Sequence, residues 1–272
     1  MILSVVIITH NEEANIGRGL ASVQPLVADG KGEIIVVDSG STDRTVEIAK
    51  SFGARVFVEE WKGFAAQKNS AIDKATGDWI LSLDADEEMG DGARDFALDL
   101  VSGRLGTTFS EFDAVEFNRR NYFLGRWIRF GGFYPDPKIR LFRRGTGSFE
   151  VRLVHEDVQL EREKKAFNPS EIYDERADFD LIHYSYPTLA DYIDHMNRYS
   201  SLGAEMAVAR GPRGFSFFNI VLRPLATFFY NYFFRLGFID GREGLLLHLY
   251  HAVYVSWKYA KAWELARKKE ST

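Results

Sequence analysis

The stretch "DWILSLDADEEM", residues 78–89, places four carboxylates directly after a short run of apolar residues. Residues 78–84 are rich in strand-forming side chains, which predicts a buried β-strand. Asp84, Asp86, Glu87 and Glu88 stand at or just beyond its carboxyl end. Open α/β sheets bind ligands at this end of their strands, so the stretch raises the question of what these acids hold.

Strand and helix patterns alternate around this stretch. Further strands are expected at residues 3–9, 33–38 and 54–59. Helices are expected after Asn11, over residues 41–52 with Ser41 or Thr42 as the N-cap, and over residues 64–75. The sequence therefore predicts an α/β fold, with a Rossmann-like, mostly parallel sheet and helices on both faces.

Polar turns follow three of the predicted strands. They are "THNEE" after the first, "DSGSTD" after the second and "DADEE" after the fourth. Because the carboxyl ends of parallel strands share one edge of a sheet, these turns are expected to converge there, although they are far apart in the sequence.

Several known uses of such acids do not fit this chain. It contains no GxxxxGK[ST] phosphate loop, "DADEEMGDGARD" lacks the ligand spacing of a calcium-binding loop, and no GxGxxG follows the first strand. What remains is a DxD pair, Asp84 and Asp86, which could share a hard divalent cation with the phosphates of a substrate. The alternative is a solvated turn whose acids lie at a helix N-terminus.

Composition sets further limits. The 272 residues have a formal charge of −5, which gives no general attraction to nucleic acid, so no nucleic-acid partner is expected. There is no cysteine, which fits a reducing compartment such as the cytoplasm. The apolar N-terminus lacks the basic start of a signal peptide and is expected to form a strand, and no apolar stretch reaches the length of a membrane-spanning helix.

A set of motifs in this order resembles a known family. The motifs are "SVVIITHNEEANI", "EIIVVDSGSTDRT" and "AAQKNSAIDKATGDWILSLDADE", followed by "YPDPKIRLFRR", "VHEDV", "LIHYSY" and "GFIDGREG". They resemble inverting family 2 glycosyltransferases of the GT-A fold, and among these the lipopolysaccharide-core enzymes of the beta-1,4-glucosyltransferase type. The resemblance spans nearly the whole chain and is most specific over the first ninety residues.

The resemblance implies a set of donor-site residues. Those expected to bind the donor nucleotide are Thr9, His10, Asn11, Glu12, Asp38, Lys68, Asn69 and Asp84. Asp38 is expected to accept a hydrogen bond from the base, since a carboxylate in front of "SGST" has little structural need to be acidic. The residues expected to bind Mg²⁺ or Mn²⁺ are Asp84, Asp86 and His183.

The resemblance also implies catalytic and acceptor-side residues. An inverting transfer needs a general base for the acceptor hydroxyl, and "VHEDV" offers Glu156 and Asp157, of which Glu156 is favoured because His155 precedes it. The segment "FGGFYPDPKIRLFRR" is expected on the acceptor side, with Tyr134, Asp136, Arg140 and Arg143, or Arg144, as its contacts.

Each of these residues also has a structural interpretation. Asp43 is expected to cap a helix, His183 is as well explained as a satisfied core residue, and His10 can contribute through its backbone. The arginines after Lys138 alternate with apolar residues, as on a half-exposed strand.

The C-terminal region is unusually aromatic. Residues 188–211 predict a core-facing helix, and residues 215–239 carry more Phe and Tyr than a helix exposes to water. The catalytic domain, a second copy of the chain or a membrane interface could cover them. We expect a catalytic domain at residues 1–210 and a helical extension at 211–272, with peripheral contact to the cytoplasmic face of the inner membrane or with a homo-oligomer partner.

Together these features predict a transferase that moves a hexose, glucose from UDP-glucose by resemblance, onto a lipopolysaccharide-core or other cell-envelope glycan. The partners are then a nucleotide-sugar donor and a lipid-linked or lipopolysaccharide-core acceptor. Two alternatives remain, a non-catalytic regulator that binds nucleotide sugar or metal, and a nucleotidyltransferase. The acid pair in "VHED" argues against the first, and the missing basic phosphate loop argues against the second.

Overall fold

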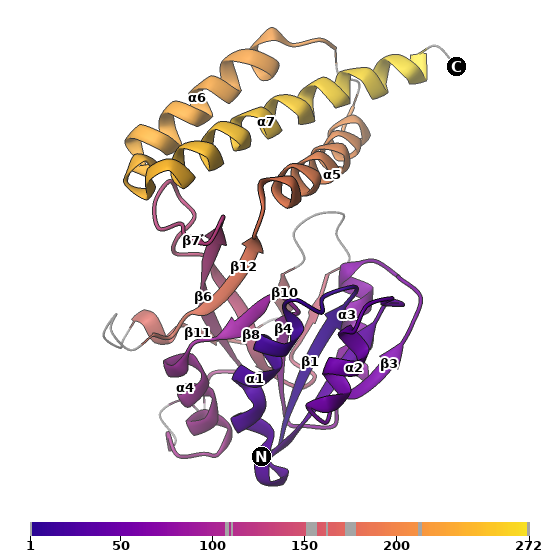
Figure 1. Ribbon diagram of the computed structural model, residues 1–272, viewed down its shortest axis with the longest axis vertical. Helices are drawn as coiled ribbons and strands as arrows, with labels where there is room; N and C mark the ends of the chain where they lie inside the picture. Colours follow the sequence, from indigo (N-terminus) through magenta and orange to yellow (C-terminus); the bar gives the residue numbers. More distant parts are fainter. Residues whose placement is uncertain are drawn as a thin grey trace. The chain divides into compact units, whose positions relative to one another are not determined.

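The chain forms two compact units, which are described separately. The computed structural model describes residues 2–106, 109, 111–150, 157–161, 163–171, 178–211 and 214–270. Within these ranges unit 1 comprises residues 2–120, 136–150 and 157–184, and unit 2 comprises residues 121–135 and 185–270 (Figure 1). Unit 2 thus includes two segments before residue 210 that the predicted division assigns to the first domain, and that division stays a prediction.

The N-terminal half of the sheet in unit 1 is parallel, as the sequence predicts. Strand β1 (Leu3–Thr9) lies between β2 (Gly32–Asp38) and β4 (Trp79–Asp84), and β2 pairs with β3 (Arg55–Val58). Thr9 is level with Asp38, and Ile8 is level with Asp84. The strands that precede the three polar turns therefore end together at one edge.

The other half of the sheet is largely antiparallel, which makes the sheet mixed. The strand order of the whole sheet is β3-β2-β1-β4-β8-β6-β12-β5. The added strands are β8 (Pro137–Arg143), β6 (Ala114–Phe123), β12 (Leu181–Tyr186) and β5 (Glu87–Met89), and β11 (Ala166–Phe167) pairs with β6 in parallel. A separate hairpin is formed by β9 (Gly147–Phe149) and β10 (Val158–Leu160).

Helices cover both faces of this sheet because alternate residues of each buried strand point to opposite sides. Val5 and Ile7 share one core with α1 (Ile16–Val27), α2 (Thr45–Ser51) and α4 (Asp91–Val101), whereas Val6 and Ile8 share the other with α3 (Phe64–Asp73). The short 3₁₀ turns of unit 1 are η1 (Ala28–Gly30) and η2 (Pro169–Glu171). The predicted fold class is confirmed.

The start of α2 differs from the prediction. The helix begins at Thr45, and neither Ser41 nor Thr42 is its N-cap. The Asp43 carboxylate accepts a hydrogen bond from the backbone N–H of Thr45 at 3.0 Å and another from that of Glu13 at 3.1 Å. Asp43 therefore satisfies amides at the helix start, in line with its expected capping role.

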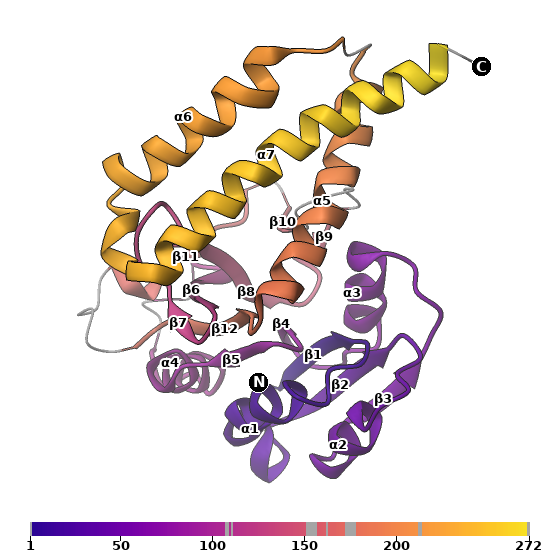
Figure 2. The same ribbon diagram turned by 45° about the horizontal axis from the view of Figure 1, so that its top comes forward.

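Unit 2 is mainly helical. It contains α5 (Leu189–Ala209), η4 (Phe218–Leu222), α6 (Arg223–Phe229), η5 (Tyr230–Phe234), η6 (Gly237–Asp240) and α7 (Gly241–Glu270), and β7 (Arg126–Trp127) pairs with the end of β6. Thr188 and Asp191 form a reciprocal capping box at the start of α5. In Figure 2, α7 runs beside both α5 and α6, with which it is in contact.

The core of unit 2 is smaller than that of unit 1. Tyr192 of α5, predicted to face the core, is buried together with Phe123, Ile128 and Leu247. The Asp240 carboxylate accepts hydrogen bonds from the backbone N–H groups of Arg129 and Phe130, which ties the 121–135 segment to η6. Among the described residues, no helix has both the length and the apolar character needed to cross a membrane.

Two glycines of α1 allow the packing of this helix to be tested. A methyl group at Gly19 would stand 2.7 Å from the backbone oxygen of Glu87, whereas one at Gly17 would meet Ile48 at an ordinary 3.6 Å. We expect Gly19→Ala to lower the free energy of unfolding by about 1–3 kcal/mol through overpacking. Gly17→Ala, the matched control, should raise it by about 0.5–1 kcal/mol because alanine favours helix. Urea denaturation measures both, and equal effects would contradict the close contact between α1 and β5.

Candidate functional site

The polar turns after β1 and β2 are joined by hydrogen bonds at the carboxyl edge of the sheet. The amide oxygen of Asn11 accepts from the backbone N–H of Thr42 at 2.8 Å, and the Ser41 hydroxyl accepts from the backbone N–H of Asn11 at 2.8 Å. The backbone N–H of Glu12 donates to the Thr45 hydroxyl at 2.8 Å. The predicted convergence of these two turns is therefore present. His10, in the turn after β1, is exposed, with its ring 3.3 Å from the Asn11 amide.

Asp38 has a structural role that the sequence analysis did not foresee. Its carboxylate is buried and accepts from the backbone N–H groups of Gly40 and Ser41, each at 2.9 Å, and from the Ser41 hydroxyl. The statement that an acid is hardly needed here is thus wrong, because a carboxylate holds this glycine-containing turn together. The contact of Asp38 with the base of the donor nucleotide stays a prediction.

Two buried hydroxyl groups at this edge have no hydrogen-bond partner among the described residues. They belong to Thr9, at the end of β1, and Ser39, directly after β2. The two residues are adjacent, since the backbone N–H of Ser39 donates to the carbonyl of Thr9 at 2.9 Å. Buried hydroxyl groups are normally satisfied, so each of these two has room for a hydrogen bond to a bound water or ligand.

Asp84, the first acid of the DxD pair, lies between two cations. Its Oδ1 is 2.5 Å from the Lys68 ammonium, and its Oδ2 is 2.7 Å from a guanidinium nitrogen of Arg140. Burial alone would raise the pKa of Asp84, but Lys68 and Arg140 hold it far below its usual range. Asp84 is therefore a fixed, fully charged acceptor.

Asp84 is one member of a continuous ladder of alternating charges within unit 1. Arg140 donates to both carboxylate oxygens of Glu87, at 2.7 and 2.9 Å, and Arg119 contacts Glu87 at 3.3 Å and Asp136 at 2.7 Å. Lys138 then lies 3.6 Å from Asp136 and 3.0 Å from Asp157. The ladder runs through Lys68, Asp84, Arg140, Glu87, Arg119, Asp136, Lys138 and Asp157.

Asp86, the second acid of the pair, faces a histidine instead of a lysine or arginine. Its Oδ2 is 3.2 Å from Nε2 of His183, which β12 places opposite Glu87 of β5. The backbone N–H of Tyr184 also donates to the carbonyl of Asp86 at 3.1 Å. Burial raises the pKa of Asp86, but the contact with His183 outweighs it and lowers the pKa below its ordinary value.

Glu12 adds a further carboxylate to this edge. The pKa of Glu12 is raised above its ordinary value, mainly by burial and also by the nearby charges of Asp86, Asp43 and Asp84. The hydrogen bond from Asn15 acts in the opposite direction. No three His, Asp or Glu side chains in the described part of the chain converge into a preformed metal cluster. The acids form an acid-rich edge that includes the carboxylate–imidazole pair of Asp86 and His183.

Lys68 and Asn69 lie together on α3 but make different contacts. The Lys68 ammonium, besides its pairing with Asp84, lies 4.9 Å from the centre of the Phe149 ring. The Asn69 side chain donates to the carbonyl of Phe149 at 2.8 Å and accepts from its N–H at 2.9 Å. Asn69 thus fastens β9 to α3, and its contact with a nucleotide stays a prediction.

The predicted catalytic acids are only partly visible. Glu156, the favoured base, and His155 lie outside the described residues. Asp157 is described, is exposed and pairs with Lys138 at the end of the charge ladder.

Of the predicted acceptor-side residues, Asp136 and Arg140 are both members of the charge ladder. Arg140 is buried, and its guanidinium is occupied by Asp84 and Glu87, which argues against contact with an acceptor. Asp136 pairs with Arg119, and Tyr134 lies in unit 2 with its ring 5.3 Å from that of Trp127.

Arg143 and Arg144 lie at the opposite edge of the sheet. Arg143 is level with Trp79 and stacks over its ring at 4.6 Å, and Arg144 donates to the carbonyl of Gly77. Trp79 begins the strand that Asp84 ends, and five steps along a strand span roughly 16 Å. These two arginines therefore do not belong to the acid-rich edge.

Sequence reasoning missed the residues that hold the ladder together. Glu87 was counted among the acids without a role, and Arg119 and Lys138 were not singled out. Little local signal was available, because buried residues do not alternate regularly along β6 and β8 and a register shift between Val115 and Glu116 interrupts their pairing. The partners of Arg119 and Arg140 come from strands far away in sequence.

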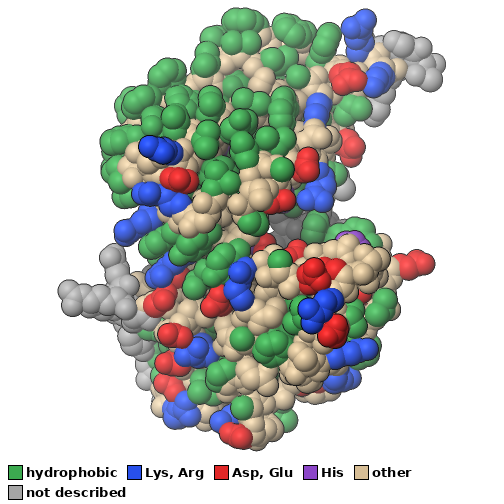
Figure 3. Space-filling view, viewed as in Figure 1, with side chains coloured by type: hydrophobic (Ala, Val, Ile, Leu, Met, Phe, Trp, Pro, Cys, Tyr) green, Lys and Arg blue, Asp and Glu red, His purple; other side chains and the backbone are tan. Residues whose placement is uncertain are grey.

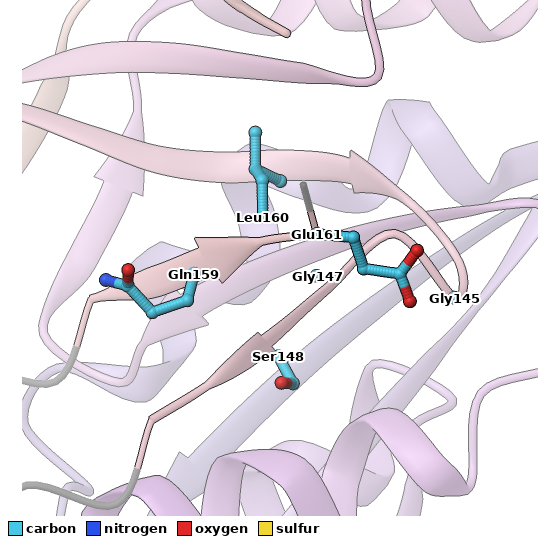
Figure 4. Close-up of a pocket in the computed structure, with 6 residues that line it drawn as sticks. All are labelled: Gly145, Gly147, Ser148, Gln159, Leu160 and Glu161. Atoms are coloured by element: carbon cyan, nitrogen blue, oxygen red, sulfur yellow. The ribbon is translucent and has the colours of Figure 1, made fainter. Parts of the chain in front are cut away.

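A shallow pocket lies elsewhere on unit 1, along the β9–β10 hairpin. It is lined by Gly145, Gly147, Ser148, Gln159, Leu160 and Glu161. Figure 4 shows the side chains of Gln159 and Glu161 pointing away from each other. None of the residues predicted to bind donor, metal or acceptor lines it.

This fold and its acid-rich edge are those expected of a glycosyltransferase. Comparison with known proteins identifies the family. The sequence model of glycosyl transferase family 2 matches residues 4–146. An uncharacterised glycosyltransferase of Rickettsia typhi is 30% identical over 99% of this chain and 89% of its own length. The chain therefore belongs to glycosyl transferase family 2 and is a glycosyltransferase.

Two further similarities concern particular proteins. The lipopolysaccharide core biosynthesis glycosyltransferase LpsC of Rhizobium meliloti is 28% identical over 96% of this chain and 92% of its own. The structure of the mannosyltransferase PcManGT of Pyrobaculum calidifontis, in complex with GDP-Man and Mn²⁺, superposes over 98% of this chain and 86% of its own, with a TM-score of 0.51 at 17% identity. The latter shows a common fold.

The centre of the charge ladder can be tested by removing one charge. Glu87→Gln leaves Arg140 and Arg119 without their shared, fully buried counter-charge. We expect a loss of about 3–5 kcal/mol in the free energy of unfolding, as for other broken buried ion pairs.

The matched control is Glu47→Gln, which removes an exposed partner of Arg44 and should leave stability unchanged. Guanidinium denaturation measures both variants. A Glu87→Gln variant as stable as the control would show that the ladder contributes little.

Proposed function

We propose that this glycosyltransferase moves glucose from UDP-glucose, with inversion, onto a lipopolysaccharide-core or similar cell-envelope glycan. The observation that carries the proposal is the Asp86–His183 pair beside the charge-compensated Asp84, at the edge where the parallel strands end. The similarity to LpsC supports the choice of acceptor class.

The Asp86–His183 pair fits a divalent cation. Carboxylate oxygen and imidazole nitrogen are both ligands for Mn²⁺, and a carboxylate is the usual protein ligand of Mg²⁺ when phosphates supply other positions. Both side chains are only partly exposed, with 26% and 16% of their surfaces accessible. A cation held there would neutralise the charge that develops on the departing nucleoside diphosphate.

Asp84 has a different part in this proposal from the one that a DxD pair suggests. Because Lys68 and Arg140 already occupy one oxygen each, Asp84 is better suited to accept a hydrogen bond from a ribose hydroxyl than to complete a cation shell. The unpartnered hydroxyls of Thr9 and Ser39 would add donors and acceptors for the nucleotide on the same edge.

The transfer also requires an acceptor hydroxyl to lose its proton. Glu156 or Asp157 would take this proton as the hydroxyl attacks the anomeric carbon, on the face opposite the leaving diphosphate. Lys138 positions Asp157 through their 3.0 Å ion pair.

Donor binding can be measured as thermal stabilisation. UDP with Mn²⁺ should raise the melting temperature of the wild-type protein, because a ligand that binds only the native state stabilises it by mass action. The shift should disappear in Asp86→Ala, which removes one proposed cation ligand.

GDP, ADP and CMP serve as controls for the nucleotide, and Asp73→Ala, at the end of α3, controls for loss of a carboxylate. A shift for GDP instead of UDP would overturn the proposed donor. No shift for any nucleotide would overturn the donor site itself.

The general base can be identified by measuring turnover and donor binding on the same variants. We expect Glu156→Gln to lower kcat by about 10²- to 10⁴-fold, the range for removal of a general base, while the UDP-induced thermal shift stays. Asp157→Asn is the paired variant, and the larger loss identifies the base. If neither variant lowers turnover, the base lies elsewhere. If the wild type binds donor but transfers no sugar, the regulator interpretation is favoured.

A further inference from the structure

Unit 2 carries an apolar surface that no described residue covers. This surface, which we call the aromatic face, lies on α6 and on the π-helical segments η4 and η5 that flank it. It consists of Phe218, Leu222, Leu225, Phe229, Tyr230, Phe233 and Phe234. Phe218 is 62% exposed and Phe234 is 79% exposed. In Figure 3 hydrophobic side chains gather over the part of the surface that α6 and α7 form in Figure 1.

The position of these rings follows from helical geometry. Consecutive residues of a helix point about 100° apart, so the rings of residues 228–230 cannot all face one neighbour. Phe228 stacks on Tyr232, whose ring is 6.1 Å from that of His248 on α7. The outward directions are left to two exposed stacked pairs, Phe229 with Phe233 at 5.7 Å and Tyr230 with Phe234 at 6.3 Å.

Within the segment that carries the aromatic face, the charges are of one sign. Residues 215–239 contain ten Phe or Tyr, two arginines and no Asp or Glu. Both arginines, Arg223 and Arg235, are exposed. Over residues 214–272 there are eight Lys or Arg against four Asp or Glu, a net +4 in a chain whose net charge is −5.

The two arginines are held beside aromatic rings. The guanidinium of Arg223 donates to the Tyr259 hydroxyl at 2.5 Å, and that of Arg235 lies 5.4 Å from the centre of the Tyr230 ring. Rings flanked by arginines are typical of a surface that meets the headgroup region of a lipid bilayer, where the apolar part of a ring and its polar surroundings are both satisfied.

We propose that the aromatic face docks on a lipid bilayer that contains anionic headgroups, with α6 lying in the plane of the interface. Rings would insert among the acyl chains near the headgroups, and Arg223 and Arg235 would contact phosphates. A second copy of the chain suits the surface less, because two such faces would bring arginines together without an acid in the segment to pair them. The docking is independent of the proposed reaction and donor.

Vesicle flotation tests the apolar part of the proposal. Wild-type protein should float with vesicles of phosphatidylcholine and phosphatidylglycerol. The double variant Phe218→Ser/Phe234→Ser should bind the vesicles at least roughly tenfold more weakly than the wild type, because two ring insertions are lost. The matched control is Val58→Ser/Trp61→Ser, which removes exposed apolar side chains from unit 1 and should float like the wild type.

A second variant tests the charged part without altering the aromatic face. Arg223→Gln/Arg235→Gln should float more weakly on anionic vesicles and lose most of its preference over phosphatidylcholine alone, and added salt should reduce wild-type binding in the same direction. Circular dichroism of each variant verifies that the fold is retained.

Two results would overturn the proposal. One is equal flotation of the wild type and the Phe218→Ser/Phe234→Ser variant. The other is a wild-type protein that does not float but sediments as a dimer, with the same variant sedimenting as a monomer, since the face would then join two copies.

Discussion

The candidate site depends on the guanidinium of Arg140, which is buried between Asp84 and Glu87 and donates to both. Moving any of these charges out of water costs several kcal/mol, and the cost is offset only when each charge has well-placed partners. Lys68 and Arg119 complete the arrangement on the two sides. Asp84 consequently stays ionised and fixed at the strand end, without needing a bound cation to keep it so.

This arrangement separates the two acids of the DxD pair chemically. Asp84 is paired with permanent cations, whereas Asp86 contacts an imidazole, a group that can bind a metal ion. The antiparallel pairing of β5 with β12 brings His183 to this place, from a strand nearly a hundred residues further along the chain. The proposed cation site would therefore be assembled by the sheet, not by the DxD turn alone.

The parts of the fold that the sequence predicts well are those with local signals. The first four strands and the helices between them follow from apolar periodicity and polar turns, and their parallel pairing places the three turns at one edge. The antiparallel half depends on long-range pairing between β4, β8 and β6, which no local pattern reveals. For that reason Arg140 was expected at an acceptor, and Glu87 and Arg119 were given no role. Asp38 was misjudged for a related reason, because the amides that it accepts from are visible only once the turn has folded.

The charge ladder also determines how this chain could be recombined with a relative. Its members come from separate elements, from Lys68 on α3 to Arg119 on β6 and Arg140 on β8. A chimera whose crossover falls between residues 68 and 140 takes part of the ladder from each parent. A buried charged residue from one parent would then face a residue from the other parent that did not evolve to pair with it. Crossovers before α3 or after β8 keep that central block from a single parent. The useful boundary for exchange is thus set by the buried charges, even where a surface loop offers a more convenient junction.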